Sequence, residues 1–199
     1  LNLTKNWDIL ISFIGTQEPF GLIGDLEPEK IIDGISINLS YQIAIISQLI
    51  KTRSVKKRSK KVILFAGGGT NSAPTHYSTY IISKIGLIKF TELIASEYSD
   101  IHSTIIGPGW VKTKIHLPTL NKGSEICPKS YFETKRRFEN NEFIEIERVV
   151  QCLDHIISHK DGKFSGRNIS VQYDDWEAPE FLSESLFSSN AYKLRRLEK

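Results

Sequence analysis

A tyrosine and a lysine in the stretch from Tyr77 to Glu92 have a spacing that could carry out acid–base chemistry. Tyr80 and Lys84 are four residues apart, so on a helix they share one face. A phenol with a pKa of about 10 is a poor base at neutral pH, but a neighbouring ammonium favours the phenolate and lowers that pKa. Such a pair can give a proton to, or take one from, an alcohol or carbonyl oxygen.

The same spacing occurs a second time, at Tyr131 and Lys135, so spacing alone is not diagnostic. Tyr80 follows an apolar run that ends in three glycines, as a residue beyond a buried strand would. Tyr131 follows no such run and precedes two arginines in a polar region. The surroundings therefore favour Tyr80 and Lys84 as the chemical pair, and the second pair is interpreted as non-catalytic.

The elements that must position this pair follow from hydrophobic periodicity. Short apolar runs next to glycine predict strands, and longer runs of helical spacing predict helices. The expected strands are 7–15, 61–66, 101–106 and 166–174; the expected helices are 28–50, 78–98 and 144–158, with two short helices within 110–143. Strands alternating with helices predict βαβ units and a parallel sheet covered on both faces, which is an α/β fold.

Three glycine-containing segments follow the expected strands, namely Gly15 onwards, Gly67 to Gly69, and Gly107 to Gly109. In open α/β sheets, ligands bind beyond the carboxyl ends of the strands. Glycine is useful there because the backbone can turn sharply or approach a ligand closely. Each segment by itself could also be a plain turn, but three at the same edge predict a ligand site.

Composition narrows the functional class. The 199 residues suit one domain, and two cysteines do not make a disulfide framework, so a reducing cytoplasm is expected. No apolar run reaches the roughly 18 residues of a membrane span. The basic run from Lys51 to Lys61 is interpreted as a solvated connection, with a nucleic-acid or anionic-membrane patch as the alternative. No aromatic residue interrupts that run, which argues against stacking on single-stranded nucleic acid.

Histidines at metal-ligand spacing occur on the last predicted helix. His155 and His159 are four residues apart, with Cys152 and Asp154 nearby. No third ligand lies at a persuasive spacing, and histidine is favoured near the end of a helix for dipole reasons. The sequence therefore predicts no metal site.

Five blocks, taken in order, resemble the short-chain dehydrogenase/reductase family. They are INLS around Asn38, VILFAGGG before residue 70, Tyr80-x-x-x-Lys84, IIGPGWVKT at 105–113 and SGRNISVQYD at 165–174. The resemblance implies a Rossmann-like, doubly wound fold and an oxidoreductase that transfers hydride between NAD or NADP and a carbonyl or alcohol. It further implies a small-molecule substrate, no nucleic-acid or membrane partner, and a homodimer or homotetramer.

The resemblance also assigns roles to residues. Tyr80 would be the general acid/base, Lys84 would lower its pKa and bind the nicotinamide ribose, and Asn38 would hold a water in a proton relay. The other cofactor contacts implied are Gly15, Pro108, Gly109, Val111 and Thr113. The implied substrate contacts are Gly67, Thr70, Trp110 and His116. The variable substrate loop would span 114–143, where polar and basic residues suit a polar or anionic substrate such as a sugar derivative.

The chain departs from the family pattern at three places. Gly67 stands where the family has a catalytic serine, and Thr70 or Ser72 is a candidate replacement donor. The usual Asn-Asn-Ala-Gly reads Ser-Phe-Ile-Gly at 12–15, so a supporting polar contact is expected to be lost. No glycine-rich phosphate turn precedes Trp7.

These departures predict a single domain over 1–199 that corresponds to the C-terminal portion of the fold. It would lack the first βαβ half with its cofactor-binding segment, and residues 175–199 would form a polar C-terminal tail. The missing serine also leaves a second hypothesis open, a non-catalytic relative that binds a nucleotide or a partner chain.

Overall fold

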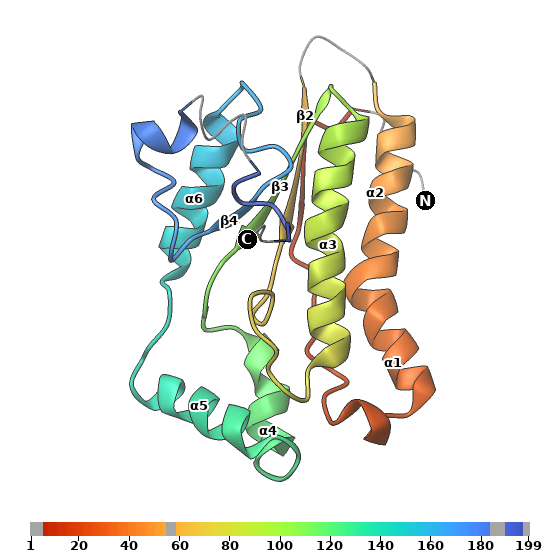
Figure 1. Cartoon of the computed structure of the whole chain (residues 1–199), viewed down its shortest axis with the longest axis vertical. Coiled ribbons are helices and arrows are strands. Elements are labelled where there is room, and N and C mark those ends of the chain that lie inside the picture. The colour runs from red at the N-terminus through yellow and green to blue at the C-terminus, as the bar shows by residue number, and fades with distance from the viewer. Residues whose placement is uncertain (1–5, 55–58, 184–189, 197–199) are drawn as a thin grey trace.

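A parallel sheet with helices on both faces forms the centre of the protein (Figure 1). The computed structural model describes residues 6–54, 59–183 and 190–196. Within these residues the sheet runs in the order β1 (Ile9–Ser12), β2 (Lys60–Phe65), β3 (Ile101–Gly107) and β4 (Asn168–Ser170). All three strand pairings are parallel, so the predicted α/β architecture is confirmed.

The helices form a layer on each side of this sheet (Figure 1). On one face lie α1 (Pro28–Ile35), α2 (Tyr41–Thr52) and α3 (Ser78–Glu97); on the other lies α6 (Ile146–Ser158). Two further helices, α4 (Leu117–Ile126) and α5 (Pro128–Glu139), lie beyond the carboxyl ends of the strands. Every predicted helix is therefore present, including the two short ones expected within 110–143.

Strand β2 shows why the continuous apolar runs form a buried sheet. Val62 and Leu64 pack into the core beneath α2 and α3, whereas Ile63 and Phe65 pack into the core beneath α6. Alternate residues of a strand point to opposite faces, so a strand that is covered on both sides must be apolar throughout. These two cores fix the positions of β2 and β3. The carboxyl ends of these strands form the edge of the sheet at which a ligand is expected to bind.

The strand β1 forms an edge of the described sheet and is less well covered. Ile9 is 43% exposed, and Phe13, which follows the strand, is 67% exposed although its ring stacks on Phe65 with centroids 4.5 Å apart. Within the described residues β1 pairs only with β2. An exposed apolar edge strand is a surface on which another strand can pair.

The C-terminal part of the chain departs from expectation in two ways. The predicted strand 166–174 is wrong in length, because β4 ends at Ser170, where the Asp174 carboxylate accepts a hydrogen bond from the Ser170 N–H at 2.7 Å and the chain turns. The predicted tail 175–199 is partly docked, since Tyr192 accepts a hydrogen bond from the Asn168 N–H at 2.8 Å. Residues 184–189 and 197–199 of that tail, like 55–58 of the basic run, lie outside the described residues.

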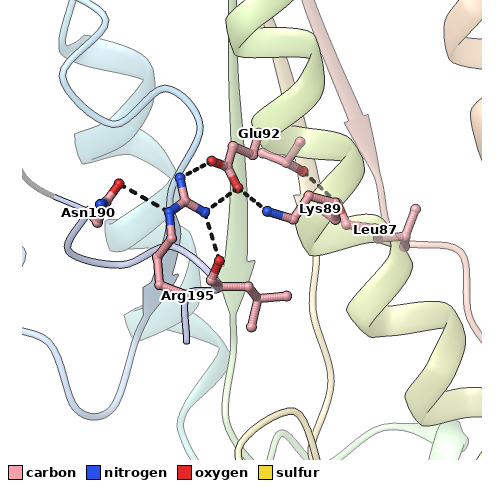
Figure 2. Close-up of polar contacts among 7 residues, drawn as sticks. Leu87, Lys89, Glu92, Asn190 and Arg195 are labelled. Carbon is pink, nitrogen blue, oxygen red and sulfur yellow. Dashed lines mark hydrogen bonds and ion pairs between the residues drawn. The ribbon is translucent and has the colours of Figure 1, made fainter. Parts of the chain in front are cut away.

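An ion pair fastens the docked tail to α3 (Figure 2). Arg195 donates two hydrogen bonds to the Glu92 carboxylate, one of them 3.0 Å long, and another to Asn190 at 3.1 Å. Lys89 donates to the same carboxylate at 2.6 Å. These donors, Arg195 first, lower the pKa of Glu92 to about 2. The described tail therefore lies against the sheet and α3.

Arg53 joins the end of α2 to the turn before β3. Its guanidinium donates two hydrogen bonds of 2.8 Å to the Asp100 carboxylate and one of 2.6 Å to the Ile50 carbonyl. It also lies 5.0 Å from the centre of the Tyr98 ring. The hydrogen bond from Arg53 is the main cause that lowers the pKa of Asp100. The side chains of Arg53 and Asp100 are 13% and 29% exposed, so this bidentate pair is partly shielded from solvent.

Arg53→Ala is expected to lower the free energy of unfolding by about 1–3 kcal/mol, because charge-assisted bidentate hydrogen bonds are lost and Asp100 keeps its charge without its partner. Urea unfolding at pH 7 measures the change. Arg136→Ala is the matched control: this arginine pairs with Glu133 and Glu142 but is 47% exposed, so a smaller loss is expected. Equal losses in the two variants would contradict the stabilising role assigned to Arg53.

Candidate active site

The site lies at the carboxyl ends of β1, β2 and β3, where the three glycine-containing segments meet one edge of the sheet. Gly15 follows β1, Gly67 follows β2 and Gly109 follows β3. Helix α3 begins at Ser78 on the same side and brings its first turns across this edge. This is the position at which open α/β sheets bind ligands.

Lys84 joins the ends of the two strands. Its ammonium donates hydrogen bonds to the Ile14 carbonyl at 3.2 Å and the Phe65 carbonyl at 3.0 Å. The residue is 3% exposed, and burial lowers its pKa to about 8. A Cβ placed on Gly15 would lie 3.3 Å from the ammonium nitrogen, so this glycine lets the chain pass close to Lys84.

Tyr80 lies one turn before Lys84, with its ring buried at the end of β2. It is 8% exposed and packs in a small cluster with Phe20, Tyr77 and Cys127. Burial raises the pKa of Tyr80 to about 12. The Lys84 ammonium lies 5.7 Å from the centre of the Tyr80 ring.

Burial raises the pKa of Tyr80 in this structure, whereas Lys84 was expected to lower it. The ammonium is hydrogen-bonded to two main-chain carbonyls, and both side chains are buried away from water. Desolvation disfavours each charged form, so it raises the phenol pKa and lowers the ammonium pKa. Tyr80 is therefore protonated at neutral pH, as a proton donor must be.

Asn38 is fully buried and lies at the same edge. A π-helical turn at Ser36–Ser40 connects α1 to α2, so the predicted helix 28–50 is present but interrupted. The Asn38 amide makes two hydrogen bonds with the main chain of Thr16, accepting at 2.8 Å and donating at 2.9 Å. A Cβ on Gly15 would lie 3.6 Å from the Asn38 side-chain oxygen and 3.3 Å from Lys84, so the two side chains flank one point of the loop after β1.

A buried glutamine completes this arrangement and was missed by the sequence reasoning. The Gln42 amide donates to the Asn38 carbonyl at 2.6 Å and accepts a hydrogen bond from the Ser12 hydroxyl at 2.7 Å. Ser12, in the departing segment 12–15, thus makes a polar contact with a side chain of α2. The position of Gln42, one turn after Asn38 on the same helical face, was the available signal.

The segment after β3 carries the other residues expected to hold a cofactor. Gly109 has a φ of 75°, and a Cβ there would lie 2.9 Å from Ile144, so a side chain would strain the turn. Pro108 and Gly109 follow β3, the strand next to β2, and so lie at the ligand edge. The Val111 carbonyl accepts a hydrogen bond from His116 at 3.0 Å, and Thr113 precedes the turn at Lys114–His116.

Trp110 and His116 are packed together at the start of the expected substrate loop. Their rings are parallel within 2°, with centroids 4.8 Å apart, and the Arg137 guanidinium lies 4.5 Å from the Trp110 ring. Burial and the nearby Arg137 lower the pKa of His116. Arg137 was not singled out from the sequence, because α5 folds back onto Trp110 only in the tertiary structure.

The remaining candidates lie apart from this cluster. Lys135 pairs with Glu139 at 3.8 Å on the exposed side of α5, as a surface helix would. In the described residues no hydrogen bond joins Thr70 to Tyr80. The rings of His155, in the last turn of α6, and His159, which follows the helix, have centroids 4.4 Å apart. Over residues 6–54, 59–183 and 190–196 no group of three or more His, Cys, Asp or Glu side chains could hold a metal ion.

Known proteins resemble this chain in sequence and in fold. No protein-family model matches the chain. The short chain dehydrogenase tazN of Aspergillus terreus is 25% identical over 183 residues, which cover 89% of this chain and 36% of tazN. The chain thus spans about a third of the length of this curated relative. None of the helices in the described part has both the length and the apolar character that a membrane span requires.

Solved structures share the fold. The KRED1-Pglu enzyme superposes with a TM-score of 0.73 at 20% identity, over 81% of this chain and 68% of its own. A short-chain dehydrogenase/reductase from Saccharomyces cerevisiae gives 0.71 at 18% identity, over 85% and 67%. Actinorhodin polyketide ketoreductase, solved with NADPH, gives 0.69 at 21% identity, over 82% and 65%.

The comparisons agree with the architecture of the chain. The parallel sheet is the Rossmann-like sheet of these enzymes, and the chain covers about two thirds of each of them. Tyr80 and Lys84 lie on a helix at the carboxyl edge of that sheet, with Asn38 beside them. The chain thus shares the fold of these enzymes and is 25% identical in sequence to a curated short chain dehydrogenase.

Proposed function

We propose that the protein is an NAD(P)-dependent oxidoreductase that reduces a carbonyl group to an alcohol. The observation that carries this proposal is the convergence of Tyr80, Lys84 and Asn38 on the carboxyl edge of the sheet. The nicotinamide cofactor would supply the hydride. Tyr80 would donate the proton to the carbonyl oxygen, so that hydride and proton together give the alcohol.

The protonation state of Tyr80 suits the role of a proton donor. Tyr80, with its pKa raised to about 12 by burial, holds its proton at neutral pH and can donate it. Lys84, with its pKa lowered to about 8, exchanges protons readily near neutral pH and can resupply the phenol. Its contacts with the ends of β1 and β2 also place it where a cofactor ribose would be held. Asn38 would keep the loop at Thr16 in place beneath both groups.

The residues at the strand ends fit a nicotinamide cofactor. Gly15 has no side chain where Lys84 and Asn38 flank the backbone, and Gly109 turns with a positive φ beside Pro108. Val111 and Thr113 continue this segment toward the substrate loop. Actinorhodin polyketide ketoreductase was solved with NADPH and 4-hydroxyisoleucine dehydrogenase with NADH, which supports either NADP or NAD here.

The dinucleotide part of the cofactor would need strands beyond β1. We place those strands on the open edge of β1, where Ile9 and Phe13 are exposed in the described structure. They would come from a longer polypeptide or from a partner chain. The choice between NAD and NADP would be made in that part.

The substrate is proposed to be a polar or anionic carbonyl compound, such as a sugar derivative. It would enter between Tyr80 and the substrate loop at 114–143, where Trp110, His116 and Arg137 form one packed group. Arg137 lies in that wall, and its guanidinium also donates to the Glu133 carboxylate at 2.8 Å. The protein would act in the cytoplasm as a homodimer or homotetramer. Exposed apolar residues on α2 and α3 suit such pairing, among them Tyr41, Ile45, Ile82 and Leu93.

Titration of the 199-residue chain with NADH and NADPH, followed by nicotinamide fluorescence, tests the proposal. Saturable binding is expected if the strand ends and Lys84 build a cofactor site, and the tighter ligand identifies the preferred cofactor. Lys84→Met should weaken this binding, while Lys135→Met, in the second Tyr-x-x-x-Lys pair, should not. Folded chain that binds neither cofactor, alone or with the segment that pairs on β1, would refute the proposal.

A non-catalytic binding protein is the second candidate. The observation that favours it is Gly67 in place of a catalytic serine, since loss of one stabilising donor can cost about 10²–10³ in rate. Such a protein would bind the cofactor and would not turn it over. Measurement of turnover alongside binding separates the two candidates.

A further inference from the structure

The glycine that replaces the expected serine is in direct contact with Tyr80. A Cβ built on Gly67 would lie 2.2 Å from the Tyr80 hydroxyl, 2.6 Å from Cζ and 2.7 Å from Cε1. Two of these atoms belong to the ring, so the overlap is with the rigid part of the side chain. No L-residue other than glycine fits at position 67 while Tyr80 keeps this position.

The other two glycines of the turn have different reasons to be present. Gly69 has a φ of 87°, and a Cβ there would meet Ile81 at 2.8 Å. A Cβ on Gly68 would meet nothing within 4 Å. Gly67 and Gly68 both lie outside the left-handed region, so no positive φ requires glycine at either position. At Gly67 the obstacle to a side chain is therefore Tyr80 itself.

Tyr80 cannot easily move to make room. Its ring packs against Phe20, Tyr77 and Cys127, and the cluster is closed by Ile81 and Ile115. Interiors are close-packed, so a side chain added at position 67 would have to push the phenol out of this cluster. Within the described residues no hydrogen bond links another side chain to the Tyr80 hydroxyl.

We propose that Gly67 is a positioning residue, which sets the place of the Tyr80 hydroxyl by leaving room for it, so that Tyr80 acts as the single side-chain donor to the substrate carbonyl. This inference rests on the proposed reductase function for its chemical meaning. It changes the interpretation of the missing serine. The glycine is then part of a different arrangement of the site, and a serine restored at position 67 would displace the phenol and lower turnover.

A double-mutant cycle tests the contact without cofactor or substrate. Gly67→Ala should lower the equilibrium constant for folding about tenfold or more when Tyr80 is present, because overpacking is destabilising. In the Tyr80→Ala background the same change should have no such cost, since the added methyl enters vacated space. Gly68→Ala is the matched control and should shift stability equally in both backgrounds. Equal effects of Gly67→Ala in the two backgrounds would overturn the proposal.

A second measurement covers the case in which a Tyr80→Ala variant does not fold. Nitration of Tyr80 by tetranitromethane, followed by peptide mass spectrometry, reports how accessible the phenol is. Gly67→Ser should increase the rate of nitration over the wild type, and Gly68→Ser should not. An unchanged rate in Gly67→Ser would show that the phenol keeps its position beside a serine, against the proposal.

Turnover separates the failure of this inference from the failure of the proposed function. If the protein reduces carbonyls and Gly67→Ser raises kcat, the reductase function stands and the positioning role of Gly67 falls. If no form of the protein turns over, but the cycle shows the coupling, then Gly67 positions Tyr80 in a protein with another function. A fall in kcat for Gly67→Ser, with cofactor binding unchanged, is the expected result.

Discussion

Tyr80→Phe is expected to lower kcat by about 10²–10⁴-fold, the range for removal of a general acid. The phenylalanine keeps the ring in the cluster with Phe20, Tyr77 and Cys127, so the fold should be preserved. Oxidation of NADPH or NADH at 340 nm with a panel of ketones and aldehydes measures turnover, in the form of the protein that binds cofactor. Cofactor affinity should change much less than kcat, because the lost hydroxyl group acts on the reacting carbonyl.

Tyr131→Phe is the matched control for this variant. Tyr131 begins the second Tyr-x-x-x-Lys spacing, but it lies on α5 beside Phe132 and away from the strand ends. Its replacement should leave kcat close to that of the wild type. Turnover that survives in Tyr80→Phe would exclude Tyr80 as the acid, and a wild type that binds cofactor without turnover would support the binding-protein alternative.

Lys84→Met is expected to cost about 10²-fold or more in kcat and to change the pH dependence of stability. In the wild type the pKa of Lys84 falls from 10.5 to about 8 on folding, because burial disfavours the ammonium. Between these two values the unfolded chain binds more protons than the folded one, so stability rises with pH. Below pH 8 both states are protonated and the cost of burying the charge is fully present.

Urea unfolding of the wild type and Lys84→Met from pH 7 to pH 10 measures this effect. The wild type should gain about 2 kcal/mol relative to the variant across this range, since one pKa unit corresponds to about 1.4 kcal/mol. Lys89→Met, five residues along α3 and with a 45% exposed side chain, is the control for a general effect of lost charge. A difference between wild type and Lys84→Met that is constant with pH would show that the ammonium is not desolvated.

The local patterns in the sequence determined the elements and their order. The apolar run at 61–66 had to form a buried strand, because both of its faces are apolar. The helical spacing of the following segment then placed Tyr80 and Lys84 on one face. Glycines at the strand ends indicated the ligand edge, since parallel strands end on the same side. These features depend on residues near in sequence, so they could be predicted.

Contacts between distant residues decided the chemistry of the site. Burial in the folded protein raised the pKa of Tyr80, and the fold bound the Lys84 ammonium to the carbonyls of Ile14 and Phe65. Sequence spacing suggested an ammonium free to act on the phenol, and the fold placed it elsewhere. Likewise, the Ser12 to Gln42 contact joins residues 30 positions apart.

The meaning of Gly67 was also decided only by the tertiary structure. In the sequence it was a missing serine, which suggested a weakened site. In the fold the Tyr80 ring occupies the space that a side chain at position 67 would need. Chain order and helical periodicity specify which elements form, because they are local properties. Packing between a turn and a helix specifies which atoms meet, and for this protein that packing determines where the Tyr80 hydroxyl lies.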